Sequence, residues 1–121
     1  MQFYNLPIFL EIGKKKSLEL ASIIDREFDK VETKKIILLT SKGIHTKYQD
    51  FIEFLAHKYK HLTIYFVEDS TYDISVEIAK KISINGYDMV IGFGGGKILD
   101  TAKYAAYVSK LIFISIPTTL S

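Results

Sequence analysis

Residues 92–103 read Gly92-Phe93-Gly94-Gly95-Gly96-Lys97-Ile98-Leu99-Asp100-Thr101-Ala102-Lys103. This stretch follows the short apolar run 89–91 and leads into a pattern typical of a helix. Glycines lack a Cβ and let a backbone approach a neighbour closely, and the free N–H groups of a helix N-terminus bind anions. Lys97 adds a positive charge directly after the glycines. We therefore predict a turn between a strand and a helix that binds a phosphate group.

The rest of the chain alternates between strand-like and helical patterns. Apolar runs predict strands at 8–12, 36–39, 62–67, 88–91 and 111–116. Helical spacing predicts helices at 17–28, 71–84 and 96–109, and a capping box of Thr46 and Gln49 predicts another that ends near residue 60. Such alternation is typical of the α/β class. We expect one domain, residues 1–121, with a Rossmann-like open, mostly parallel sheet and helices on both faces.

The composition is that of an ordinary globular protein, with 121 residues, 48% of them hydrophobic, and a net charge of +2. The basic residues are scattered, so no nucleic-acid partner is expected. No apolar run reaches the roughly 18 residues of a membrane span, so no membrane partner is expected either. The absence of cysteine excludes disulfides and thiol catalysis and fits a cytoplasmic location. His45, His57 and His61 show no convincing metal-ligand spacing.

Three loops are expected at the carboxyl ends of the strands, where open parallel sheets bind ligands. They are residues 40–43, 92–97 and 117–121. The glycine loop is not a P-loop motif, because Ile98 stands where that motif requires a serine or threonine. It is not Gly-x-Gly-x-x-Gly either, because Lys97 stands at the sixth position. A tight turn whose glycines serve only packing is the alternative interpretation.

Two further groups near these loops also have alternative interpretations. The hydroxyls and N–H groups of Thr118 and Thr119 suit a phosphate or a ribose, and they suit ordinary turn chemistry equally well. Asp100 is expected in the first turn of its helix, where a negative charge complements the helix dipole. There it would also support the glycine loop through hydrogen bonds to backbone N–H groups. We favour these structural roles of Asp100 over contact with a ligand.

Three motifs taken together, at 94–97, 100–103 and 116–119, resemble a superfamily that contains iron-type alcohol dehydrogenases, glycerol dehydrogenases and dehydroquinate synthases. Lys97 after the glycines is similar to glycerol dehydrogenases and sn-glycerol-1-phosphate dehydrogenases. The runs 102–107 and 113–118 most resemble the glycerol-1-phosphate branch. The architecture resembles the family over the whole chain, whereas the motifs lie within residues 88–121.

The resemblance implies NAD or NADP as the cofactor. The dinucleotide would lie along the glycine loop and the threonine turn, at Gly94, Gly95, Gly96, Lys97, Ile98, Thr118, Thr119 and Ser121. Many NAD-preferring members hold the ribose with an aspartate at the end of the second strand, where this chain has Thr40 or Ser41 and then Lys42. We therefore assign Ser41 and Lys42 to the cofactor site. We expect Lys42 to pair with a 2′-phosphate and NADP to bind within about a hundredfold of NAD.

The resemblance places the chemistry outside these 121 residues. In the family a divalent metal (Zn, Fe or Ni) is held by an aspartate and histidines of a helical C-terminal domain, and it polarises the substrate oxygen. We therefore expect no catalytic and no metal-binding residue in this chain. We expect the chain to be the N-terminal domain of a larger enzyme, and by itself to bind cofactor weakly without turnover.

Three functions fit these expectations. The first is NAD(P)-dependent oxidation of glycerol, glycerol 1-phosphate or a related small polyol or phosphorylated alcohol. The second is cyclisation of the dehydroquinate synthase type, against which Lys97 argues mildly. The third is a nucleotide-binding module that acts alone. The resemblance also makes a homo-oligomer a candidate assembly.

Overall fold

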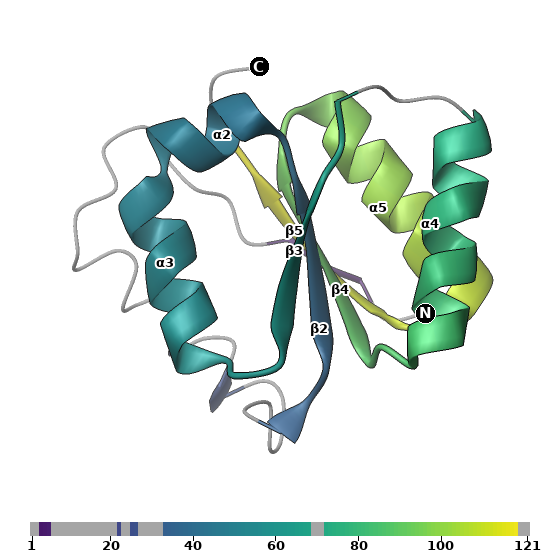
Figure 1. The fold of residues 1–121 in the computed structure, drawn as a ribbon, viewed down its shortest axis with the longest axis horizontal. Helices are drawn as coiled ribbons and strands as arrows, with labels where there is room; N and C mark the ends of the chain where they lie inside the picture. Colours follow the sequence, from purple (N-terminus) through teal and green to yellow (C-terminus); the bar gives the residue numbers. More distant parts are fainter. Residues whose placement is uncertain (1–2, 6–21, 23–24, 27–32, 69–71, 119–121) are drawn as a thin grey trace.

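The computed structural model of the chain describes residues 3–5, 22, 25–26, 33–68 and 72–118. In chain order the elements are β1 (Phe3–Asn5), β2 (Ile36–Thr40), α2 (Lys42–Lys47), α3 (Gln49–Lys58), β3 (Leu62–Phe66), α4 (Tyr72–Asn85), β4 (Met89–Gly94), α5 (Gly96–Ser109) and β5 (Ile112–Pro117) (Figure 1). None of these helices is long and apolar enough to cross a membrane.

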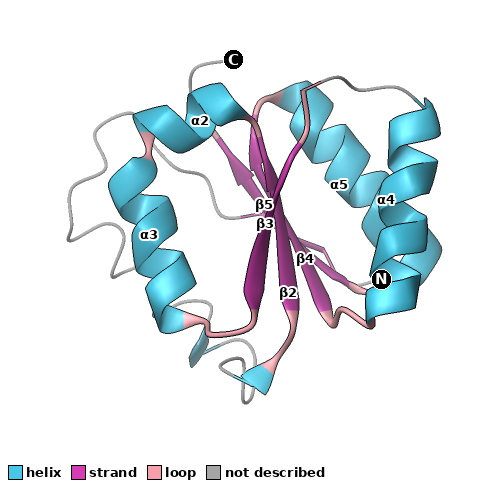
Figure 2. Cartoon of the chain, in the orientation of Figure 1, coloured by secondary structure: helices cyan, strands magenta, loops and turns pink. Residues whose placement is uncertain are grey.

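The described strands form one five-stranded sheet in the order β1-β5-β4-β2-β3, and every neighbouring pair is parallel (Figure 2). Parallel neighbours need a crossover between them, and helices provide it here. The predicted α/β class with a parallel sheet is therefore confirmed. The strand predicted at 8–12 lies outside the described residues. So does most of the helix predicted at 17–28, of which Ser22, Asp25 and Arg26 are described and helical.

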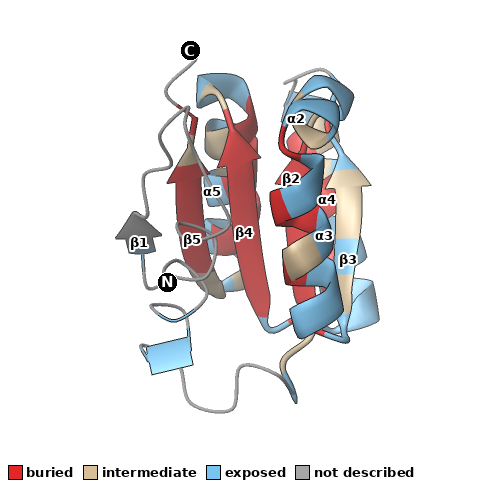
Figure 3. Cartoon of the chain, turned by 90° about the vertical axis from the view of Figure 1, so that its left-hand side faces the viewer, coloured by how far each residue is buried: buried red, intermediate tan, exposed pale blue. Residues whose placement is uncertain are grey.

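Helices cover both faces of the sheet, with α2 and α3 on one side and α4 and α5 on the other (Figure 1). Leu38, Ile91 and Leu55 belong to the core on the α3 side. Ile37 and Val90 belong to the core beneath α4 and α5. Figure 3 shows β4 and most of β5 as buried. Because central parallel strands are covered on both faces, their sequences are continuous apolar runs rather than alternating ones.

The capping box of Thr46 and Gln49 predicted where the helical segment after β2 begins, and that predicted start is wrong. The chain enters a helix earlier, at Lys42, and the N-cap is Ser41, whose Oγ accepts a hydrogen bond from the Ile44 N–H at 3.1 Å. Tyr48 separates α2 from α3 and gives α3 no side-chain cap. Gln49 bonds instead to Glu53, so the predicted capping box does not form. Serine is among the strongest N-cap residues, which explains why the helical segment begins after Ser41 and not at Thr46.

The glycine stretch divides between a strand and a helix. The strand predicted at 88–91 extends to Gly94, whereas α5 begins at Gly96 and ends at Ser109 as predicted. Asp100 is consequently in the second turn of α5, and its predicted place in the first turn is wrong. The predicted stop after α4 is confirmed, because Gly86 has a φ of +70° there.

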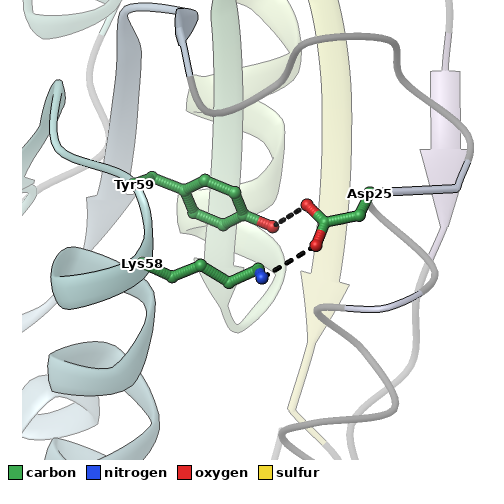
Figure 4. A network of polar contacts seen from close by, with 3 residues as sticks. All are labelled: Asp25, Lys58 and Tyr59. Carbon is green, nitrogen blue, oxygen red and sulfur yellow. Dashed lines mark hydrogen bonds and ion pairs between the residues drawn. The ribbon is translucent and has the colours of Figure 1, made fainter.

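Two contacts attach the N-terminal part of the chain to the rest of the fold, one at β5 of the sheet and one at the end of α3. In β1, Phe3 is paired with Phe113 of β5, their rings are 5.3 Å apart, and Lys103 lies over the Phe3 ring. Asp25 forms an ion pair with Lys58 at 2.8 Å and accepts a hydrogen bond from the Tyr59 hydroxyl at 3.1 Å (Figure 4). Both contacts join residues far apart in sequence, so they stabilise tertiary rather than local structure.

Aromatic side chains also connect the two helices on the α4–α5 face. The Tyr72 and Tyr104 rings lie 6.0 Å apart in an edge-on arrangement. A side-chain hydrogen bond with Tyr72, and to a smaller extent burial, raises the pKa of the Tyr104 hydroxyl above its usual value. The hydroxyl therefore stays protonated throughout the neutral pH range.

Candidate functional site

The carboxyl ends of β2, β4 and β5 are joined by hydrogen bonds at one edge of the sheet. The buried Thr40 hydroxyl donates to the Phe93 carbonyl at 2.8 Å, which fixes the end of β2 against the end of β4. On the other side of β4, the Thr118 N–H donates to the Gly94 carbonyl at 3.1 Å. The three predicted loops therefore begin side by side, as expected for a parallel sheet.

Gly92 and Gly94 are required by packing. A Cβ on Gly92 would lie 2.9 Å from the Cβ of Ala102, so glycine allows α5 to approach β4 closely. Gly94 has a φ of +150°, and a Cβ there would lie 2.7 Å from Cδ1 of Ile98. L-residues with side chains rarely adopt that backbone conformation. The alternative interpretation of the sequence, packing glycines, therefore holds for these two positions.

Gly95 and Gly96 are different, because a Cβ on either would have no described atom within 4 Å. Gly95 is the N-cap of α5, with extended backbone, and its carbonyl accepts a hydrogen bond from the Leu99 N–H at 3.0 Å. Glycine has no side chain with which to cap the helix, and the first N–H groups of a helix have no partner within it. The N–H groups of Gly95 and Gly96 therefore have no hydrogen-bond partner among the described residues, and the space beside these glycines is clear of described side chains.

Thr118 adds a buried polar group next to Gly94, whose carbonyl accepts a hydrogen bond from the Thr118 N–H. Its side chain is only 5% exposed, and its Oγ1 has no hydrogen-bond partner among the described atoms. A buried hydroxyl without a partner is uncommon and calls for an explanation, such as an absent ligand. Thr119 and Ser121, the other predicted residues of this turn, lie outside the described residues.

The remaining predicted residues of the glycine loop have distinct surroundings. Lys97 is exposed on the first turn of α5, whereas Ile98 is 8% exposed and belongs to the core beneath that helix. The Thr101 hydroxyl donates to the Lys97 carbonyl at 2.9 Å. Asp100 is exposed, and no hydrogen bond joins it to the described loop residues. Its support of the loop stays a prediction.

At the end of β2, Ser41 and Lys42 form the start of α2 rather than a loop. The Ser41 hydroxyl is engaged as the N-cap, and the Lys42 side chain is exposed. The Lys42 N–H donates to Oε1 of Glu68 at 3.4 Å. Sequence reasoning missed Glu68. Its position directly after a predicted strand was the available signal, since that position belongs to the same sheet edge.

The residues present fit a phosphate-containing ligand better than a metal. Gly95, Gly96 and Thr118 leave room and free hydrogen-bonding groups, as described above. Within the described ranges, no three histidine, aspartate or glutamate side chains are grouped so as to hold a metal ion.

Comparison with known proteins identifies relatives of this chain. Residues 14–121 match the family model described as iron-containing alcohol dehydrogenase. A glycerol-1-phosphate dehydrogenase of Methanococcus maripaludis, named for NAD(P)+, is 34% identical over 116 residues, which are 96% of this chain and 30% of the relative. A homologous enzyme of Saccharolobus islandicus is 43% identical over 53 residues, which are 44% of this chain and 14% of the relative.

Solved structures show the same fold. A crystal structure of an iron-containing alcohol dehydrogenase superposes with a TM-score of 0.71 at 23% identity, over 96% of this chain and 37% of that one. Glycerol dehydrogenase from Schizosaccharomyces pombe superposes with a TM-score of 0.64 at 18% identity, over 96% of this chain and 27% of that one. The chain thus spans 37% or less of the length of each of these four proteins. Because the family model covers almost its whole length, the chain belongs to the iron-containing alcohol dehydrogenase family.

Proposed function

We propose that residues 1–121 form the dinucleotide-binding part of an NAD(P)-dependent dehydrogenase that acts on glycerol 1-phosphate, glycerol or a related alcohol. The observation that carries the proposal is the start of α5. There Gly95 and Gly96 leave space over their N–H groups, and Thr118, whose N–H donates to the adjacent Gly94 carbonyl, has a buried hydroxyl without a described hydrogen-bond partner. A pyrophosphate has the negative charge and the acceptor oxygens that such donors bind.

Each residue of the site would have its own part in holding the dinucleotide. Backbone N–H groups at Gly95 and Gly96 would donate to the pyrophosphate, and the Lys97 ammonium would offset its charge. The Thr118 hydroxyl would take up a hydrogen bond that it lacks in the free chain. When bound, the nicotinamide ring supplies the position that accepts or donates a hydride. The chain's own residues bind and orient that group.

The substrate is proposed from the relatives. Relatives named glycerol-1-phosphate dehydrogenase align with 96% of this chain, which favours a phosphorylated polyol over plain glycerol. The same names favour oxidoreduction over cyclisation of the dehydroquinate synthase type. We also propose that the whole enzyme uses a divalent metal and forms a homo-oligomer. Its proposed location is the cytoplasm.

Binding experiments on the 121-residue chain test the cofactor site. We expect NADH and NADPH to bind in a fluorescence titration, and ATP and inorganic phosphate to bind more weakly. Gly95→Val should weaken dinucleotide binding at least about tenfold, because its side chain would fill the space over the N–H groups. The fold should tolerate that change, since no described atom lies within 4 Å of a Cβ at Gly95.

Ala56→Val is the matched control, because Ala56 is exposed on α3 and the substitution adds similar bulk to a helix away from the sheet edge. It should leave binding unchanged. Unchanged binding in a folded Gly95→Val chain would overturn the glycine-loop assignment. Equal affinity for ATP and NADH would instead favour a general nucleotide-binding module.

A further inference from the structure

The site contains a carboxylate that is not part of the glycine loop or of the end of β2. Glu68 follows β3, and the Val67 N–H before it donates to the Thr40 carbonyl at 2.7 Å. That bond holds the end of β3 against the end of β2. It places the exposed Glu68 side chain next to Lys42, whose N–H donates to its Oε1 at 3.4 Å. The carboxylate thus lies where α2 begins.

This position is within reach of a dinucleotide bound at α5. In the sheet, β2 is the neighbour of β4, and β3 is the next strand beyond it. Neighbouring strands are about 4.8 Å apart, so Glu68 lies about two strand spacings from the glycine loop. A ligand with its pyrophosphate on Gly95 and Gly96 could extend along the ends of β2 and β3. On the β2–β3 side it would meet Ser41, Lys42 and Glu68.

Glu68 has opposite effects on a ribose and on a phosphorylated ribose. An ionised carboxylate accepts hydrogen bonds from both hydroxyls of a ribose, and acidic residues do so in dinucleotide-binding folds. A 2′-phosphate in the same place would be repelled by that charge. It would also lose the Lys42 N–H as a donor, because Glu68 already accepts from it. Specificity of this kind comes from repulsion of the wrong ligand as much as from attraction of the right one.

Lys42 has the opposite effect on cofactor preference, because its positive charge favours a 2′-phosphate. Its exposed ammonium takes part in no ion pair with a described residue, so it can move toward a 2′-phosphate. The two side chains at the start of α2 therefore balance each other, one favouring the unphosphorylated ribose and the other the phosphorylated one. Whether the site prefers NAD+ or NADP+ depends on which of these two side chains has the larger effect on binding.

We propose that Glu68 is the residue that determines cofactor preference in this site, by accepting hydrogen bonds from an adenosine ribose and disfavouring a 2′-phosphate. The proposal rests on the dinucleotide-binding function proposed above. It assigns the ribose carboxylate to the end of β3, although the sequence has no carboxylate at the end of β2. NAD+ is then the preferred cofactor, and NADP+ remains tolerated because of Lys42.

The test is the ratio of the dissociation constants of NADP+ and NAD+, measured by calorimetry at low ionic strength. In the unsubstituted chain the ratio should exceed one and remain below about a hundred. Glu68→Gln keeps the size of the side chain and removes its charge. It should lower the ratio about tenfold, by tightening NADP+ binding and weakening NAD+ binding. Lys42→Gln should raise the ratio, mainly through weaker NADP+ binding.

Glu77→Gln is the control, because Glu77 is an exposed glutamate on α4 and the substitution makes the same change in net charge. A ratio that is unchanged in Glu68→Gln, or shifted equally in Glu77→Gln, would overturn the assignment. Glu68 is exposed, so Glu68→Gln should keep the fold, which circular dichroism checks. If neither dinucleotide binds the folded unsubstituted chain, the proposed function fails, and the role of Glu68 with it. Normal binding with an unchanged ratio rejects Glu68 alone.

Discussion

Glycines that look alike in the sequence have different physical reasons for being glycine. A Cβ on Gly92 or Gly94 would lie 2.9 or 2.7 Å from a side-chain atom of α5. A Cβ on Gly95 or Gly96 would have no described neighbour within 4 Å. Sequence reasoning predicted a phosphate-binding loop, but it could not separate these roles, because they depend on how closely α5 approaches β4. At the residue scale, the proposed cofactor site therefore rests on Gly95 and Gly96 rather than on Gly92 and Gly94.

Two buried tyrosines offer a further residue-scale prediction. The Tyr48 hydroxyl is buried without a described hydrogen-bond partner, whereas the Tyr59 hydroxyl donates to Asp25. Removing an unsatisfied buried polar group costs nothing in hydrogen bonding. Tyr48→Phe should therefore leave the free energy of unfolding unchanged or raise it by up to about 1 kcal/mol.

Tyr59→Phe is the comparison. It should lower the free energy of unfolding by about 1 kcal/mol, because the ring stays in place and a hydrogen bond is lost. Urea denaturation followed by circular dichroism measures both changes. A clear loss of stability in Tyr48→Phe would mean that its hydroxyl has a partner, for instance a buried water molecule.

At the scale of elements, the sequence predicted most strands and the two longest described helices. Continuous apolar runs such as 36–39 indicated buried parallel strands, and the bounds of α5 were predicted correctly. The helix α2 was missed. It has six residues, none of them buried, so it has no apolar pattern by which to recognise it. Its formation depends on a serine cap, a local feature that weighs little beside hydrophobic periodicity.

The cap of α2 can be tested directly. Ser41→Ala removes the hydroxyl that accepts from Ile44 and should lower the free energy of unfolding by about 1 kcal/mol. Thr46→Ala should cost less, because the Thr46 hydroxyl only donates to the Lys42 carbonyl one turn back in the same helix. Thermal denaturation of the two variants gives the comparison. A larger loss in Thr46→Ala would contradict the cap assigned here.

At the scale of the whole molecule, the described fold provides one wall of a site. The sheet edge offers the groups that we propose hold a dinucleotide, and the described residues include no group of three metal ligands. The chain matches about a third of its relatives' length. The metal ligands and substrate contacts could not be predicted residue by residue. The family resemblance places them in a C-terminal domain, which this sequence does not include.

The prediction at this scale concerns catalytic turnover by the 121-residue chain. The 121-residue chain mixed with NAD+, glycerol 1-phosphate and Zn2+ should produce no NADH absorbance above the rate without protein, even where titration shows cofactor binding. Binding and chemistry should separate because they depend on different parts of the family's enzymes. Sustained NADH formation that Gly95→Val abolishes would show that these residues suffice for catalysis.

The pairing of β1 with β5 has a consequence for how the chain reaches its fold. Phe3 and Phe113 are about 110 residues apart in the sequence, so their pairing closes a very long loop. Closing so large a loop costs entropy before any contact offsets it, and such topologies fold slowly. The residues of β1 must therefore wait until β5 has been synthesised before they find their strand neighbour. Until β1 pairs with it, β5 is an open edge of the sheet, and such an edge can pair wrongly with another molecule.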